Sequence, residues 1–175
     1  MNVLITPVTA ADVEDVAALA RQIWQHTYLG IITQEQIDFM LEQRYNQPRL
    51  REELTMPQIW WEQARVAGRL AGFSSCLLTA AGEMKLDKIY VDAQQQRMGI
   101  GAQLIDHAAC RAVAMGCSTL ILAVNKHNER AIAAYRKHGF ALRESVRVDI
   151  GHGFVMDDFI MAKSLLSPTA DSPPR

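Results

Sequence analysis

Two glycines, Gly99 and Gly101, stand one residue apart in the stretch VDAQQQRMGIGAQL (91–104), where a backbone turn could hold a phosphate group. An apolar pattern with helical spacing follows them, so the turn lies where a helix begins. The first amides of a helix have no internal partners and lie at the positive end of its dipole. The amides from Gln96 to Ala102 could therefore surround a phosphate or pyrophosphate, and Arg97 adds positive charge nearby.

The residues after the glycines exclude the commonest phosphate-binding motifs. A P-loop needs Gly-Lys-Ser/Thr, but Gly101 is followed by Ala102 and Gln103. A dinucleotide fingerprint needs a third small residue where Leu104 stands. It also needs an acidic residue at the end of the next strand, and LILAVNKHN (120–128) has none close. Taken alone, the two glycines are also compatible with a merely structural turn.

A strand and a helix must position this turn. EMKLDKIYV (83–91) reads as the strand, and the helical pattern runs from Ile100 to Gly116. The continuous apolar run STLILAV (118–124) is typical of a strand buried on both faces. Because a crossover of this length joins parallel strands, the two strands form a parallel pair.

The other elements complete an α/β (α+β) fold: a central mixed, mostly antiparallel sheet of about seven strands with helices on both faces. Capping boxes at Thr9 and Thr33 begin two helices, and Asn128 begins another. The chain forms one domain over 1–166, with a polar, proline-rich and disordered tail over 167–175. The expected strands are 2–9, 58–66, 69–80, 83–91, 118–124, 140–150 and 154–165, and the expected helices are 10–28, 34–46, 100–116 and 128–139, with a further helical turn near 48–54.

Composition narrows the function classes. The chain has 175 residues, a net charge of -1 and 49% hydrophobic residues, which suits one well-packed domain and disfavours a nucleic-acid partner. No apolar stretch is long enough to span a membrane, and no signal peptide is visible. The three cysteines and five histidines lack metal-ligand spacing, so we expect no metal. Reduced cysteines indicate a cytoplasmic protein.

Two motifs taken together resemble the GNAT family of acetyl-coenzyme A-dependent N-acetyltransferases. The first is Q-x-x-G-x-G at 96–101, directly after the strand KIYV, and the second is N-x-x-A-x-x-x-Y-x-x-x-G-F at 128–140. The resemblance covers residues 2–165 and implies the GNAT fold, in which the parallel pair is splayed. ITQEQIDFMLEQRY, LDKIYV and DIGHGFVMDDFIMAKSL carry a second, weaker resemblance to the bacterial spermidine/spermine N-acetyltransferase-like subgroup. The chain departs from many relatives at Arg97-Met98, which leaves the binding amides unaffected.

The resemblance implies acetyl-CoA as the cosubstrate and assigns its contacts position by position. The turn amides would bind the pyrophosphate, the splayed strand would bind the pantetheine arm, and the second motif would contact the coenzyme and its thioester sulfur. Lys137 or Arg136 would meet the 3′-phosphate. The coenzyme-binding residues expected on this basis are Ile89, Tyr90, Val91, Gln96, Arg97, Met98, Gly99, Ile100, Gly101, Ala102, Asn128, Tyr135 and Lys137.

Direct attack of an amine on the thioester sets three tasks. The thioester oxygen gains charge, which a backbone amide near Val91 could stabilise. The departing thiolate needs a proton donor, and the Tyr135 phenol, with a pKa of about 10, suits a thiol of about 8.5. The amine must lose a proton, and Asp87 or Glu83 could take it through water. For each of these residues, the alternative is an exposed or ion-paired carboxylate without a catalytic role.

The sequence gives fewer signals for the residues of the acceptor site. Tyr28, at the end of the first helix, could face it. Asp157 and Asp158 are adjacent on a strand and point to opposite faces, so at most one faces the cleft; we take Asp157 as the candidate. The acceptor is a primary amine, with a polyamine such as spermidine as one candidate. An amino acid or a protein N-terminus stays open, as does a non-catalytic acyl-CoA sensor. We expect no nucleic-acid or membrane partner; a homodimer is common in the family.

Overall fold

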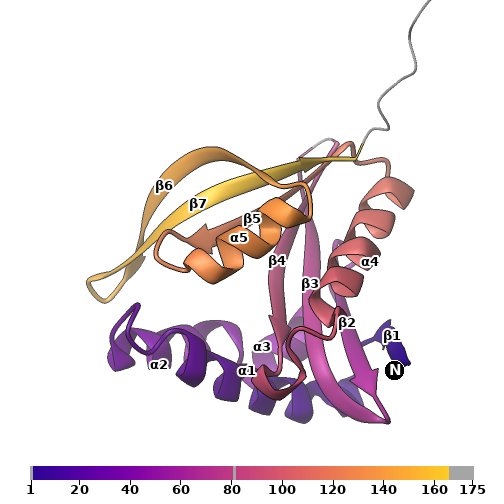
Figure 1. The fold of residues 1–175 in the computed structure, drawn as a ribbon. Helices are drawn as coiled ribbons and strands as arrows, with labels where there is room; N and C mark the ends of the chain where they lie inside the picture. Colours follow the sequence, from indigo (N-terminus) through magenta and orange to yellow (C-terminus); the bar gives the residue numbers. More distant parts are fainter. Residues whose placement is uncertain (1, 81, 166–175) are drawn as a thin grey trace, which may run out of the picture.

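The computed structural model describes residues 2–80 and 82–165. A seven-stranded sheet runs through it in the order β1-β2-β3-β4-β5-β7-β6 (Figure 1). The predicted disordered tail, 167–175, lies outside the described residues. The strands are β1 (Val3–Pro7), β2 (Ile59–Val66), β3 (Arg69–Ala80), β4 (Glu83–Val91), β5 (Thr119–Asn125), β6 (Ala141–Gly151) and β7 (Phe154–Ser164). The α-helices are α1 (Val13–Thr27), α2 (Gln34–Arg44), α3 (Gln47–Glu53), α4 (Ile100–Ala114) and α5 (Glu129–Lys137), with short 3-10 helices at Ala10–Asp12 and Ala93–Gln95.

The fold predicted from the sequence is confirmed, including the parallel pair β4–β5 in an otherwise antiparallel sheet. Both predicted capping sites begin helices: Thr9 and Asp12 form a capping box, and the Thr33 hydroxyl accepts a hydrogen bond from the Gln36 amide. The segment near Pro48 forms a full helix, α3, rather than a single further turn. The side chain of Asn46 caps α3 by accepting from the Arg49 amide at 2.8 Å.

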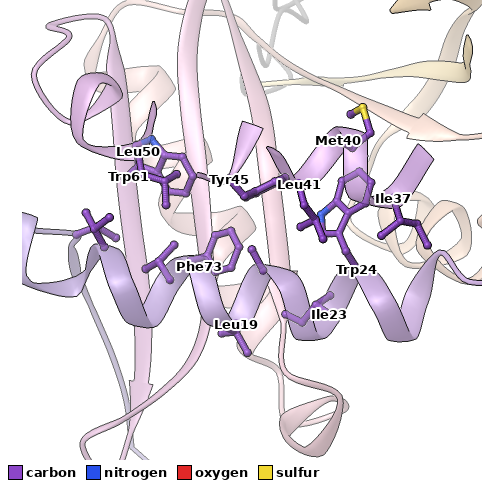
Figure 2. Packing of buried hydrophobic residues seen from close by; sticks show 14 residues of the cluster. Leu19, Ile23, Trp24, Ile37, Met40, Leu41, Tyr45, Leu50, Trp61 and Phe73 are labelled. Carbon is purple, nitrogen blue, oxygen red and sulfur yellow. The ribbon is translucent and has the colours of Figure 1, made fainter. Parts of the chain in front are cut away.

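Helices cover both faces of the sheet with separate apolar clusters. Neighbouring residues of a strand point to opposite faces, and Trp61 packs with α1–α3 while Trp60 packs with the cluster beneath α4 and α5. Figure 2 shows the first cluster, in which Trp24 of α1 lies against Leu41 and Ile37 of α2. This packing holds the end of α1 rigidly beside the middle of the sheet.

A β-bulge in β4 sets up the opening between β4 and β5. Ser75 of β3 pairs with Lys88 and Cys76 pairs with Leu86, so Asp87 is the extra residue. A bulge bends its strand and increases its twist. The β4–β5 ladder covers only the start of β4 and ends at the pair Lys85–Ile121. Beyond that pair, β4 follows β3 and β5 follows β7, and the two parallel strands separate.

The hairpin of β6 and β7 forms one edge of the sheet, and its tip reaches toward α2 (Figure 1). Its turn is Gly151-His152-Gly153, in which all three residues have positive φ angles. The hairpin contacts α2 at two points. The Gln36 side-chain amide donates to the Val155 carbonyl at 2.9 Å, and the Phe39 ring lies 5.3 Å from the Phe154 ring. Gln36 and Phe39 also line a cavity between α2 and the hairpin.

Candidate active site

A first cavity, of about 270 Å³, fills the opening between β4 and β5. Ile89, Tyr90 and Val91, which the resemblance assigned to the pantetheine arm, line it from β4. Side chains from α4, α5 and the end of α1 complete the wall. On the side that faces β5, this part of β4 lies beyond the last ladder pair, so its backbone groups can bind a ligand there.

The glycine turn lies at one end of the first cavity and joins β4 to α4. Arg97 and Gly99 both have left-handed backbone conformations, with φ angles of 65° and 77°. Only glycine adopts this conformation without strain, so the chain holds Arg97 at some cost. The amides of Ile100, Gly101 and Ala102 begin α4 and have no helical partner. Gln96, Gly101 and Ala102 line the cavity directly, whereas Arg97, Met98 and Gly99 are exposed beside it.

Helix α5 brings Asn128 and Tyr135 to the same cavity. The Asn128 oxygen accepts from the Ala131 amide at 3.3 Å and caps the helix, and the Asn128 side chain also interacts with the Tyr28 phenol. Burial raises the pKa of the half-buried Tyr135 phenol, which therefore stays protonated. Lys137, in contrast, is exposed and lies outside the lining.

A second cavity, of about 490 Å³, lies between α2 and the β6–β7 hairpin. Four residues line both cavities, namely Tyr28, Asp87, Tyr90 and Ala123. The two cavities therefore meet at the opening between β4 and β5. Burial raises the pKa values of Tyr28 and Tyr90, and interaction with the Asn128 and Tyr90 side chains offsets part of the effect for Tyr28. Both phenols are neutral hydrogen-bond donors at this junction.

Asp87 reaches the junction, but three cations hold its carboxylate. Arg44 lies 2.6 Å away, Lys88 lies 2.8 Å away, and Lys85 lies 3.0 Å away. Burial alone would raise the pKa of Asp87, but the charges of Lys88, Arg44 and Lys85 outweigh it and lower this pKa well below its usual range. A carboxylate with so low a pKa is a weak base. Its geometry makes it an anchor for the bulge.

The network around Asp87 continues into α3. Lys88 is almost fully buried and also lies 3.3 Å from the Glu53 carboxylate. The same Glu53 oxygen accepts from the Trp61 indole at 3.0 Å, and Lys88 lies over the Trp61 ring. These buried charges are paired on every side, and they tie β4 to α2 and α3.

Glu83, the other predicted base, lies far along β4 from the junction. It stands at the paired start of β4, opposite Thr119, and binds Arg143 of β6 at 2.6 Å. It lines neither cavity. Its position and its ion pair make Glu83 unsuited to take a proton from an amine at the junction.

The structure places Asp158, and not Asp157, in the second cavity. Asp157 points to the other face and pairs with Lys126. Asp158 is 4% exposed, and its Oδ1 has no hydrogen-bond partner among the described residues. Burial raises the pKa of Asp158, while Lys85 partly offsets the shift. The alternation along β7 limited the choice to one of the two, but which residue faces the cavity depends on the pairing of β7 with β5 and β6.

Several lining residues were not singled out in the sequence. Arg130 of α5 and His138, the residue directly after α5, line the first cavity, and Ile23 and Thr27 line it from α1. The helical spacing of Arg130, Ala134 and His138 places them on one face of α5, which was a usable signal. Arg44 carried no local signal, because its partner Asp87 is far away in the sequence.

Comparisons with known proteins identify the family of the chain. The family model described as "Acetyltransferase (GNAT) family" matches residues 18–140, and the chain belongs to this family. A curated relative is spermidine N(1)-acetyltransferase from Thermoplasma acidophilum, 26% identical over 161 residues, which covers 90% of this chain and 97% of the relative. The chain is thus a GNAT acetyltransferase, and acetyl-CoA is the acetyl donor in this family.

Solved structures share the fold. The PaiA N-acetyltransferase from Thermoplasma acidophilum, in complex with coenzyme A, superposes with a TM-score of 0.82 at 25% identity, and the match covers 94% of this chain and 99% of that chain. The ribosomal-protein-S18-alanine N-acetyltransferase from Escherichia coli has a TM-score of 0.69 at 22% identity, with 98% and 99% covered. Within residues 2–80 and 82–165, no helix is long and apolar enough to cross a membrane, and no group of three or more potential metal ligands occurs.

Proposed function

We propose that this protein transfers the acetyl group of acetyl-CoA to a primary amine by direct attack. The observation that carries this proposal is the meeting of two cavities where β4 and β5 separate. The first cavity has the turn amides of a phosphate site at one end, and the second has a buried, unpartnered carboxylate. A donor in one cavity and an amine in the other would place their reacting groups together.

The coenzyme would occupy the first cavity with its pyrophosphate at the glycine turn and its thioester at the junction of the two cavities. Its pyrophosphate would bind the amides between Arg97 and Ala102, with Gln96 alongside, and its pantetheine arm would lie along Ile89–Val91. Asn128 and Tyr135 would then flank the thioester end. Arg130 and His138 are better placed than Lys137 to meet the rest of the coenzyme, because they line the cavity.

Few protein groups are needed for the bond changes of acetyl transfer at the junction. The ammonium group first loses a proton to water, which frees the nitrogen lone pair. The amine nitrogen then bonds to the thioester carbon, the carbon–sulfur bond breaks, and a second nitrogen-bound proton leaves to water. A backbone amide near Val91 would stabilise the charge on the oxygen. Tyr135, whose phenol is held protonated, would donate a hydrogen bond to the departing thiolate. Its raised pKa favours hydrogen bonding over complete proton transfer, so the thiolate takes its proton from solvent.

The acceptor is a primary amine of a small molecule. The likeness to a spermidine acetyltransferase makes spermidine the first polyamine to test. An amino acid, a protein N-terminus and a non-catalytic acyl-CoA sensor are the alternatives. The test is an acetyl-transfer assay with acetyl-CoA and a panel of amines that represents each class, with detection of free thiol. Amine-dependent thiol release supports the proposal. A protein that coenzyme A protects against heat, but that releases no thiol with any amine, would instead be a sensor.

Tyr135→Phe tests the donor role directly. Loss of the hydroxyl should lower kcat roughly 100-fold, at the lower end of the range for removing one hydrogen-bond donor that acts in the transition state. Thermal stabilisation by coenzyme A should stay unchanged, because the ring still fills its place against Phe140. An unchanged kcat in this variant would remove Tyr135 from the mechanism.

A further inference from the structure

We infer that the second cavity accepts an amine with a single ammonium group on an apolar body, and not a polyamine. Asp158 binds this ammonium group. The inference rests on the proposed acetyl transfer and names the substrate class of the same site. Three features of the cavity carry it: one free carboxylate, two cations elsewhere in the lining, and walls that are mostly apolar.

Asp158 is the free carboxylate. Its side chain is buried in the cavity wall, and Oδ1 has no partner among the described residues. A buried carboxylate without a partner is costly unless a ligand supplies one. Burial raises the pKa of Asp158, so a cation bound beside it would stabilise its charged form. An ammonium group is a compact donor that would satisfy this oxygen.

The other charges of the lining leave nothing for a second ammonium. Asp87 is the only other acidic residue among the described residues that line the cavity, and Arg44, Lys85 and Lys88 already surround it. Arg44 and Lys85 also line the cavity, so the four charged groups of the lining sum to zero. A second ammonium would meet two cations and no free carboxylate.

The remaining walls suit an apolar body. Phe39 and Met40 come from α2, and Val146, Ile150 and Met156 come from the hairpin. The contacts of Gln36 with Val155 and of Phe39 with Phe154 join these two walls. The volume of about 490 Å³ lies in the usual range for small-molecule sites. Such walls gain free energy from burying hydrocarbon and none from burying a further charge.

A matched pair of amines separates the two classes with the unaltered protein. Hexylamine and 1,6-diaminohexane have the same chain length and differ by the second amino group. We expect kcat/KM for hexylamine to exceed that for 1,6-diaminohexane by at least tenfold, although the diamine offers two equivalent reactive ends. Spermidine should fall below hexylamine for the same reason. Phenethylamine, with a bulkier apolar body, should also exceed both polyamines.

Two variants and one matched control show which residues cause the preference. Asp158→Asn removes the negative charge and should lower kcat/KM for hexylamine at least tenfold, mainly by raising KM. Asp157→Asn is its matched control, because Asp157 is adjacent but faces away from the cavity. Lys85→Gln removes one of the two cations, so it should raise the ratio of kcat/KM for the diamine to that for hexylamine. Thermal stabilisation by coenzyme A shows in each case that the variant is folded.

Each outcome bears on one statement. Equal or better use of 1,6-diaminohexane or spermidine would overturn the inferred substrate class while leaving acetyl transfer intact. A faster reaction of a peptide with an N-terminal leucine would also overturn it, in favour of a polypeptide acceptor. An unchanged KM in Asp158→Asn would remove this residue from the site. Absence of thiol release with every amine would contradict the proposed function itself, and the inference with it.

Discussion

Asp87 and Asp158 are both buried in the wall of the second cavity, yet their surroundings shift their pKa values in opposite directions. Asp87 has three cations within 3.0 Å, and they lower its pKa. Asp158 lacks an ion pair among the described residues, and burial raises its pKa. The comparison shows that burial alone does not identify a functional carboxylate. The charge that is satisfied within the protein holds the fold, and the charge that is not satisfied is available to a ligand.

The largest effect should come from Asp87→Asn. The substitution leaves Arg44, Lys85 and Lys88 without their shared carboxylate, and Lys88 is deeply buried. Removing one partner of a buried ion pair typically costs about 3–5 kcal/mol. Urea unfolding should show a loss of this size, with Asp157→Asn as the control, whose exposed pair should matter little. A loss no greater than that of the control would show that the network around Asp87 contributes little.

The lowered pKa of Asp87 should also be visible in the pH dependence of the free energy of unfolding. The pKa of Asp87 is lowered from 3.8 on folding, so its contribution is present above pH 3.8 and is lost as the pH falls through its lower folded value. The difference in free energy of unfolding between the wild type and Asp87→Asn should therefore be largest near neutral pH and shrink below pH 3.8. Urea unfolding of both proteins at several pH values, over the range where both are folded, measures it. A difference that does not change with pH would contradict the assigned shift.

Gly72→Ala tests whether the position of Asp87 depends on the close approach of β3 and β4. A Cβ at Gly72 would lie 2.7 Å from the Tyr90 carbonyl oxygen, so the end of β4 must move. We expect a loss of about 1–3 kcal/mol, as for other overpacked sites, and weaker stabilisation by coenzyme A. Gly101→Ala is a control for stability, because its Cβ would make an ordinary 3.8 Å contact with Val91. Equal stability of the two variants would show that β4 tolerates the displacement.

The sequence predicted what depends on local pattern and failed where distant contacts decide. The helix start after Gly99, the buried strand at 118–124 and the splayed parallel pair follow from periodicity, crossover length and resemblance. The bulge at Asp87 and its pairing with Arg44 do not, because Arg44 comes from a helix 43 residues earlier in the chain. The choice between Asp157 and Asp158 failed for a related reason. Alternation places the two side chains on opposite faces, but it cannot say which face meets the cavity.

The smallest effect should come from Asp158→Asn, measured as stability rather than as activity. A carboxyl whose pKa is raised on folding costs stability once it ionises, so the cost is absent at acid pH and present at neutral pH. The neutral amide removes that cost. We expect the variant to lie within about 1 kcal/mol of the wild type at neutral pH, on the stabilising side. Urea unfolding at pH 7 measures it, and lowering the pH should abolish the difference. A loss as large as that of Asp87→Asn would mean that Asp158, like Asp87, holds the fold together, and the distinction between the two carboxylates would fail.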